Sequence, residues 1–335
     1  MSSSSPDTKP FIITVSSRAL FDLEESHRLF EKKGMDAFIK HQLKHEDDLL
    51  QPGPAFGLVK KLCELNKRLP PGARPVEIML LSRNSPETGL RVFNTIEKMG
   101  LPIERAVFTS GRPTSTYIDA IGVQLFLSSN PIEVGKALTA GIGAANLIAP
   151  KKALGVPSQE KIHIAFDGDA VLFSDEAERI HYEGQLPAFH RHEVEHAHRP
   201  LPAGPMKPFL DFIHQIQELF PDPEECPIRT ALITARAAPA HKRAILTLRD
   251  WGVRVDEGMF LGGRPKAPFL KAFGADLFLD DSQQNIENAM DHVASGHVPF
   301  GIRNQGTDES GFTGTSKPFE TPVEPGSRPR RTSPR

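Results

Sequence analysis

The chain has 335 residues and a formal net charge of −2, so it lacks the positive charge that drives non-specific binding to nucleic acid or acidic membranes. Its apolar content of 39% is typical of a globular protein, and its length fits about two domains. Two distant cysteines, Cys63 and Cys226, exclude a disulfide framework, and no apolar run is as long as a membrane span. These features predict a cytoplasmic protein that binds neither membranes nor nucleic acid.

Short apolar runs alternate with amphipathic stretches between two polar ends, residues 1–9 and 305–335, for which we predict disorder. In the second half of the chain, strands are predicted at 162–166, 229–234, 258–261 and 276–280, and helices at 208–220 and 241–252. Strands that alternate with helices predict an α/β fold with a parallel sheet covered on both faces, as in Rossmann-like folds.

The sequence repeats itself at a shift of about 152 residues. Residues 107–129 and 259–281 align without a gap and share nine identical residues in 23 positions. Weaker matches pair 79–101 with 231–253, 11–25 with 162–178, and 52–62 with 203–213. A repeat this long indicates related domains rather than a solenoid. We therefore predict an internal duplication that gives two tandem parallel-sheet domains, residues 10–150 and 160–304.

Reactive side chains follow each predicted strand of the second copy. They are Asp167 and Asp169 after the first strand, Thr234 at the end of the second, Lys266 after the third, and Asp280 and Asp281 at the end of the fourth. The carboxyl ends of parallel strands meet at one edge, so these groups are expected to converge. A carboxylate can attack phosphorus, a second can act as acid and base, and acidic oxygens suit Mg²⁺. A hydroxyl and a lysine can bind the phosphate oxygens. The set predicts phosphoryl transfer.

The order DGDAV, strand-end Thr, Lys and DD resembles the four motifs of the haloacid-dehalogenase (HAD) superfamily. FDGDAVLFSDEAE, LITARAAPAHKRAILTLRDWGVRVDEGMFLGG and PFLKAFGADLFLDDSQQNIENA resemble the cytosolic type I 5′-nucleotidases, and the resemblance extends over residues 10–304. It implies HAD-type domains with small helical caps, the second cap at about 175–207. It also implies Mg²⁺-dependent hydrolysis of nucleoside 5′-monophosphates, with AMP the foremost substrate. Mammalian members are activated by ADP and are homo-oligomeric, so a nucleotide effector and a homo-oligomer are expected.

The same resemblance assigns roles to the strand-end residues. Asp167 is the expected nucleophile and a metal ligand, and Asp169 is the general acid and base, which binds the metal through its carbonyl. Thr234 and Lys266 are expected to bind phosphate, and Asp280, supported by Asp281, to complete the metal site.

Three further residues are candidates for substrate binding: Arg236, His192 and His196. Arg236 follows Thr234 closely, and a structural role is its alternative. His192 and His196 lie in the predicted cap, where a solvated helix is the alternative. They also form an HExxH pattern with Glu193, which in a metalloprotease would bind zinc. The prolines that follow and the lack of a glycine-spaced third histidine argue against a protease.

The first copy lacks the chemical groups of the second. The first copy has Val15-Ser16-Ser17-Arg18 where the second has Asp167 and Asp169, with no acid in either alignment register, and Ser82 stands opposite Thr234. Thr114 replaces Lys266, and Ser128-Ser129 replace Asp280-Asp281. We predict a catalytically inactive domain. Its hydroxyl-rich crevice either binds a nucleotide or serves as a packing partner that completes the substrate pocket.

Two other functions remain open at this level. The four motifs specify phosphoryl transfer but not the leaving group, so another small phosphate ester is an alternative substrate. A non-catalytic nucleotide-sensing protein is the second alternative, although closely spaced buried carboxylates are costly without a metal.

Overall fold

The structure is a computed structural model that describes residues 9–149 and 160–305. The ends for which disorder is predicted lie, apart from residues 9 and 305, outside the described residues. The predicted boundary between the two copies, at 150–160, also lies almost wholly outside them.

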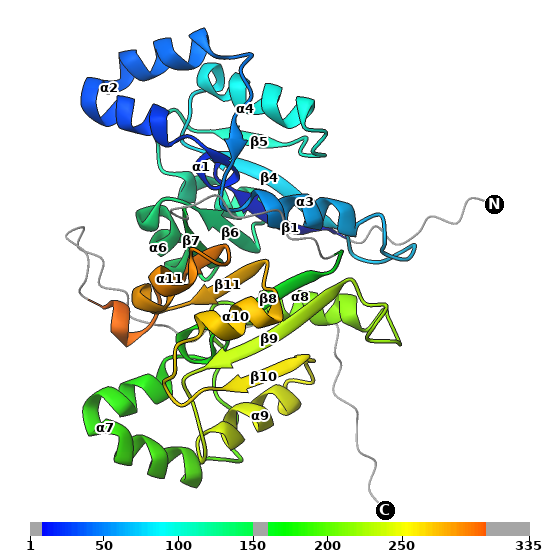
Figure 1. Cartoon of the computed structure of the whole chain (residues 1–335), viewed down its shortest axis with the longest axis vertical. Helices are drawn as coiled ribbons and strands as arrows, with labels where there is room; N and C mark the ends of the chain where they lie inside the picture. The colour runs from blue at the N-terminus through cyan, green and yellow to red at the C-terminus, as the bar shows by residue number, and fades with distance from the viewer. Residues whose placement is uncertain (1–8, 150–159, 306–335) are drawn as a thin grey trace, which may run out of the picture.

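One ten-stranded, mostly parallel sheet runs through the whole molecule (Figure 1). The first half contributes β1 (Phe11–Val15), β4 (Val76–Ser82), β5 (Ala106–Phe108), β6 (Leu125–Ser128) and β7 (Gly143–Ile148). The second half contributes β8 (Ile162–Phe166), β9 (Ile228–Thr234), β10 (Glu257–Phe260), β11 (Leu277–Asp280) and β12 (Ser295–His297). Two short strands, β2 (Phe21–Asp22) and β3 (Gln51–Pro52), form a separate pair. The predicted α/β fold with a parallel sheet is confirmed.

Helices lie between the strands in both halves. The first half has α1 (Ser17–Leu20), α2 (Glu24–Lys44), α3 (Phe56–Leu65), α4 (Pro86–Lys98), α5 (Ile118–Ile121) and α6 (Pro131–Thr139). The second has α7 (Glu176–Glu195), α8 (Lys207–Gln217), α9 (His241–Asp250), α10 (Ala267–Phe273) and α11 (Gln283–Ala289). Side chains cap the N-termini of several helices: Ser85 caps α4, Asn130 caps α6 and Ser282 caps α11.

The two halves repeat one strand order outward from a shared centre. That order is β7-β6-β1-β4-β5 in the first half and β12-β11-β8-β9-β10 in the second, and β7 pairs antiparallel with β12 at the junction. In each half a long helix, α2 or α7, follows the first strand and is interrupted once, at Gly34 or Gln185. We call these two the cap helices; both lie on the left in Figure 1. A duplication would produce this correspondence, and the duplication itself stays a prediction.

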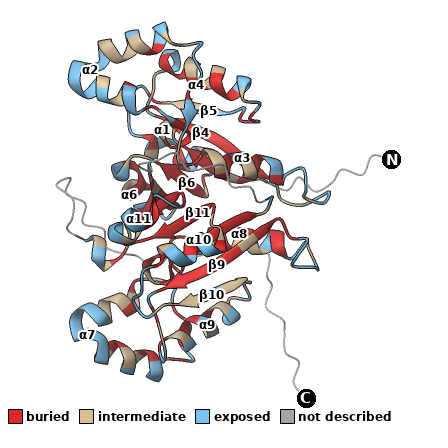
Figure 2. Cartoon of the chain, in the orientation of Figure 1, coloured by how far each residue is buried: buried red, intermediate tan, exposed pale blue. Residues whose placement is uncertain are grey.

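The hydrophobic core passes from one half into the other (Figure 2). Phe11 of β1 stacks on Phe212 of α8 with ring centroids 4.0 Å apart, and α3 of the first half contacts β8 of the second. Every residue of β8 is buried, which suits a parallel strand covered on both faces. The halves are therefore packed together through one continuous core.

The predicted elements of the second half agree closely with the observed ones. β8 has the predicted bounds, β9 and β11 differ from theirs by one residue at one end, and β10 is shifted by one residue at both ends. The helix predicted at 208–220 begins one residue earlier and ends at Gln217, ahead of Pro221.

Candidate active site

Three carboxylates meet where β8 and β11 end. Asp167 directly follows β8, and its backbone N–H donates to the carbonyl of Leu279 on the neighbouring strand β11 (2.8 Å). β11 ends at Asp280, and Asp281 follows. One carboxylate oxygen of each residue lies within 4.8 Å of the others, and all three residues are buried. The predicted convergence of Asp167, Asp280 and Asp281 is therefore present in the structure.

Lys266 joins two of these acids. It precedes α10, and its Nζ lies 2.7 Å from Asp167 Oδ1 and 2.6 Å from Asp280 Oδ2. Burial opposes the charged amine, but the two carboxylates outweigh it and raise the pKa of Lys266 above its usual value. Asp280 also accepts from Ser282 N (2.8 Å) and Asn285 Nδ2 (3.1 Å). Lys266 and Asp280 are thus held in place before any substrate binds.

Burial disfavours the charged forms of Asp167 and Asp281, and the single ammonium of Lys266 serves a group of three carboxylates. Burial raises the pKa of Asp167 to about 6, and Asp280 adds to this rise while Lys266 opposes it. Burial, with Glu178 next, raises the pKa of Asp281 well above its usual value. Asp281 Oδ2 is buried and receives no hydrogen bond from the described residues, and Arg303 Nε lies 3.6 Å from it. Positive charge is therefore scarce at the cluster. A hard divalent cation, which prefers carboxylate oxygens, fits this donor set.

Thr234 lies beside the turn that follows Asp167. It ends β9 and is buried, and a Cβ added to Gly168 would lie 3.3 Å from its Oγ1. Its hydroxyl accepts a hydrogen bond from Arg236 N (3.2 Å). Glycine at position 168 thus lets the turn pass close to the threonine hydroxyl, as the predicted phosphate site requires.

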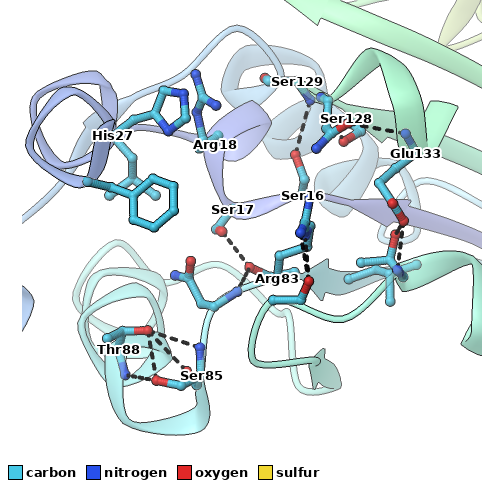
Figure 3. A pocket seen from close by; sticks show the side chains of 18 of the residues that line it. Ser16, Ser17, Arg18, His27, Arg83, Ser85, Thr88, Ser128, Ser129 and Glu133 are labelled. Carbon is cyan, nitrogen blue, oxygen red and sulfur yellow. Dashed lines mark hydrogen bonds between the residues drawn. The ribbon is translucent and has the colours of Figure 1, made fainter. Parts of the chain in front are cut away.

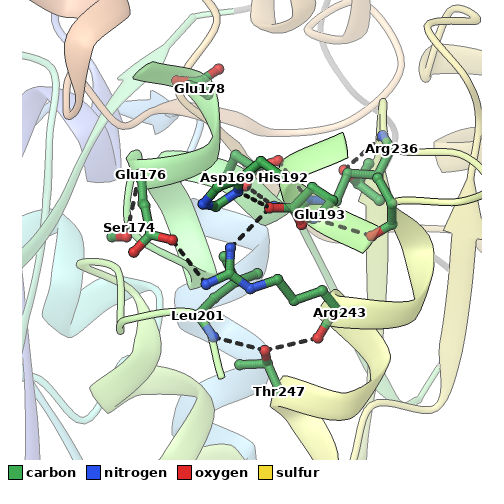
Figure 4. Close-up of polar contacts among 12 residues, drawn as sticks. Asp169, Ser174, Glu176, Glu178, His192, Glu193, Leu201, Arg236, Arg243 and Thr247 are labelled. Atoms are coloured by element: carbon green, nitrogen blue, oxygen red, sulfur yellow. Dashed lines mark hydrogen bonds and ion pairs between the residues drawn. The ribbon is translucent and has the colours of Figure 1, made fainter. Parts of the chain in front are cut away.

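Asp169 pairs with Arg236 (Figure 4). Arg236 Nε and Nη2 donate to its two carboxylate oxygens at 2.8 and 2.7 Å. Any metal contact of Asp169 in this arrangement would come from its backbone carbonyl, as the resemblance implies. The guanidinium of Arg236 also donates to Glu193 and to Ala240 O (3.2 Å), and its contact with substrate stays a prediction.

Glu193 of α7 continues this network into the cap. It accepts from Arg236 Nη1 and from Arg243 Nη1, the latter at 2.9 Å, and Arg243 Nη2 reaches Glu176 at 2.8 Å. Glu193 and Arg243 are completely buried. Neither residue was predicted from the sequence to be part of the site. The repeat contained a signal, because Glu193 and Arg243 align with Gln42 and Arg91, which also bond to each other (3.1 Å).

The two candidate histidines of the cap contact each other. The rings of His192 and His196 stack with centroids 4.1 Å apart, and His192 Nδ1 lies 3.3 Å from Glu193 Oε1. Glu193 is occupied by two arginines, so it is unsuited to act as the base of a zinc protease. In the described part of the chain, the residues grouped closely enough to bind a metal are the three aspartates.

The sequence profile of the 5′-nucleotidase family matches residues 3–305. Human cytosolic 5′-nucleotidase 1B is 36% identical over 285 residues, which are 83% of this chain and 47% of that protein. The chain thus spans about half the length of this curated relative.

A crystal structure described as a dehalogenase matches 42% of this chain and 84% of its own, at 13% identity and a TM-score of 0.27, too weak a likeness to support an argument. Within the described residues, no helix combines the length and apolar character needed to cross a membrane.

Proposed function

The chain belongs to the 5′-nucleotidase family, and on that premise we propose that it hydrolyses nucleoside 5′-monophosphates, AMP foremost, with Mg²⁺ as its metal. The observation that carries the proposal is the buried group of Asp167, Asp280, Asp281 and Lys266 at the strand ends. Three carboxylates and one ammonium are suited to hold a phosphate group only together with a divalent cation. Mg²⁺ bound there would neutralise charge on the acids and on the phosphate oxygens.

In the first step, an oxygen of Asp167 attacks phosphorus and the bond from phosphorus to the nucleoside O5′ breaks. The product is an aspartyl phosphate on Asp167, and Asp169 gives its proton to O5′. Thr234 Oγ1 and Lys266 Nζ hold the non-bridging oxygens, on which charge accumulates.

In the second step, Asp169 takes a proton from water as the water oxygen attacks phosphorus. The bond between phosphorus and Asp167 breaks, phosphate leaves, and Asp169 carries the proton needed for the next cycle.

Asp169 has to leave Arg236 before it can act as the acid. Both of its oxygens accept from Arg236, an arrangement that suits the ionised carboxylate. When Asp169 turns away, Arg236 keeps its ion pair with Glu193 of the cap helix α7. The charged arginine is therefore not left unpaired. Movement of Asp169 toward the substrate is thus part of the proposed mechanism.

The test is phosphate release from AMP by the wild type and Asp167→Asn, each with Mg²⁺ and with excess EDTA. We expect activity only in the wild type with metal, with a loss of about a thousandfold or more in the variant. Asp250→Asn, the same substitution at an exposed site at the end of α9, is the matched control and retains full activity. Acid quenching should trap a phosphoryl group on the peptide that contains Asp167.

Metal-dependent activity that survives in Asp167→Asn would show that another group is the nucleophile. If the wild type leaves AMP intact but hydrolyses other small phosphate esters, the proposed substrate would be wrong and the proposed mechanism would stand. No hydrolysis across a broad panel would favour a nucleotide-sensing protein.

The proposal also includes a cytoplasmic location and the organisation of the chain. Both cysteines are buried and free, which suits a reducing compartment. We propose that residues 10–150 and 160–304 arose by duplication, because their strand orders match. The homo-oligomer and the nucleotide effector expected from the family stay predictions.

A further inference from the structure

A cavity of about 400 Å³ lies in the first half, at the position that corresponds to the candidate active site (Figure 3). Its polar wall is made by residues at the carboxyl ends of β1, β4 and β6, among them Ser16, Ser82 and Ser128. The cap helix α2 forms the opposite wall. A cavity of this size is within the range of roughly 300–1,000 Å³ that small-molecule sites occupy.

The backbone of the first half reproduces the site without its acids. Ser16 N donates to Leu127 O (2.9 Å), as Asp167 N donates to Leu279 O, so Ser16 occupies the position of Asp167. The turn after Ser16 is one residue shorter than the turn after Asp167 in the second half. Counted from the ends of β1 and β8, Arg18 stands opposite Asp169, which reverses the charge at that position.

Negative charge is nearly absent from the cavity wall. Glu133 is the one carboxylate among the described residues that line it, and its Oε2 accepts from Thr114 N (2.7 Å) and Thr114 Oγ1 (2.6 Å). Arg18 and Arg83 also line the cavity; Arg18 Nη2 pairs with Glu24 at the rim (2.6 Å), and Arg83 Nη2 donates to Gly111 O (2.6 Å). An anion can therefore enter without the metal that the acids of the second half require.

Two buried nitrogen atoms of the wall lack hydrogen-bond acceptors. They are Arg18 Nε and Asn84 Nδ2, and neither has a partner among the described residues. Buried donors without partners are rare because desolvating them is unfavourable. Asn84 aligns with Arg236, whose longer side chain spans the equivalent space in the second half. The shorter residue leaves room, and both free donors call for an acceptor such as a phosphate oxygen.

The cap side of the cavity is apolar and aromatic. Phe30, Met35 and Phe38 of α2 line it, together with His27. Phe30 is 39% exposed and Met35 49%, although both are large apolar side chains. A planar ring placed against these side chains would be removed from water and would bury part of their surface.

We propose that this cavity binds a nucleoside phosphate and does not hydrolyse it; the choice of a nucleoside rests on the function proposed above. The phosphate accepts from Arg18 and Asn84, and the base packs against the aromatic side chains of α2. Hydrolysis does not follow because Ser16 replaces the carboxylate nucleophile. A serine hydroxyl needs a nearby base, and Glu133 is held by Thr114.

The test is calorimetric titration of AMP into full-length Asp167→Asn protein in EDTA, so that neither turnover nor metal contributes. We expect one AMP per chain, with affinity reduced about tenfold or more by Arg18→Ala. Asn84→Arg, which restores the residue of the second half, should fill the cavity and reduce binding similarly. Adenosine and inorganic phosphate, titrated separately, should each bind at least about tenfold more weakly than AMP.

Two controls locate the site. Arg112→Ala removes an exposed arginine of the same half that does not line the cavity, and Lys266→Thr weakens the other site; both should retain AMP binding in EDTA. Unchanged affinity in Arg18→Ala and Asn84→Arg, or no saturable AMP binding, would overturn the inference. Binding that depends on Arg18 supports it even if the wild type releases no phosphate from AMP, a result that would overturn only the proposed function.

Discussion

The two halves of the chain keep one backbone frame and fill it with different chemistry. Gly53 and Gly204 show how closely the frames agree. A Cβ at Gly53 would lie 2.8 Å from the carbonyl oxygen of Ala19, and a Cβ at Gly204 would lie 2.5 Å from that of Val171, the residue that aligns with Ala19. Both contacts fix the chain after the first strand of their half, and neither involves a charged group. The charged residues differ completely: aspartates and a lysine surround one crevice, and hydroxyls with two arginines surround the other.

This comparison shows that the charged site is not needed to build the fold. The first half packs its core and orders its strand ends without a buried acid cluster. In the second half, the three aspartates are retained although burial raises the pKa of Asp167 and of Asp281. Groups that oppose folding at neutral pH are expected where chemistry requires them. Exchanging residues between the halves tests this view.

The largest effect is expected for Lys266→Thr. This change gives the second half the residue that the first half has at the aligned position, Thr114. Lys266→Thr leaves Asp167 and Asp280 without the ammonium that lies 2.7 and 2.6 Å from them. Phosphate release from AMP should fall by about 100- to 1,000-fold, because the phosphate loses its fixed cation. The reciprocal Thr114→Lys should leave the rate unchanged. Steady-state rates that stay within a factor of about three of wild type would remove Lys266 from the phosphate site.

A second exchange concerns the buried arginine network. Arg236→Asn and Glu193→Gln each introduce the residue found in the first half, where Gln42 bonds to Arg91. Each single change breaks a buried pair and should lower the free energy of unfolding by about 3 kcal/mol. The double variant should lose less than the sum, by about 1–3 kcal/mol, because the pairing between Arg236 and Glu193 is lost in each single variant and can be lost only once.

Urea denaturation of the four proteins measures the coupling in this cycle. Gln42→Ala, which removes a neutral partner of Arg91, is the control and should cost about 1–2 kcal/mol. Strictly additive effects of Arg236→Asn and Glu193→Gln would mean that the two residues do not act as one network.

The smallest effect concerns the pH dependence of stability without metal. The pKa of Asp167 is about 6 in the folded protein, above its usual value, so ionisation of this residue opposes folding. The penalty is absent below about pH 4 and complete above about pH 7, and is on the order of 3 kcal/mol. Glu178, whose pKa is raised to about 7 mainly by burial, acts in the same direction.

Asp167→Asn should therefore gain stability over wild type as pH rises from about 4.5 to about 7.5 in EDTA. Urea midpoints at a series of pH values measure this difference, and added Mg²⁺ should abolish it at the upper end by stabilising the wild type. Parallel profiles for the two proteins would show that Asp167 titrates as it does in an unfolded chain.

Local patterns were sufficient to predict most of the second half. Buried parallel strands leave short apolar runs in the sequence, and turn residues bound them, so β8 and β11 were located almost to the residue. The strand-end rule then placed Asp167, Asp280 and Lys266 together. The helix at 208–220 was predicted too long because its apolar spacing continues to Phe220, although the helix ends at Gln217.

Other features depend on contacts that no local pattern contains. The pairing of Asp169 with Arg236 joins residues 67 positions apart, and Glu193 lies in a cap helix with little apolar periodicity. β12 reads Ser-Gly-His, too short and polar to predict as a strand, and its antiparallel pairing with β7 has no sequence signal. The joining of the halves into one sheet therefore became visible only in three dimensions.

That antiparallel junction has a consequence for synthesis of the chain. β7 is complete at residue 148, but its partner β12 spans only residues 295–297. Until β12 emerges from the ribosome, one side of β7 presents unpaired backbone N–H and C=O groups, which favour pairing with foreign strands. The last strand of the sheet to be translated is thus the one that protects the first half from aggregation.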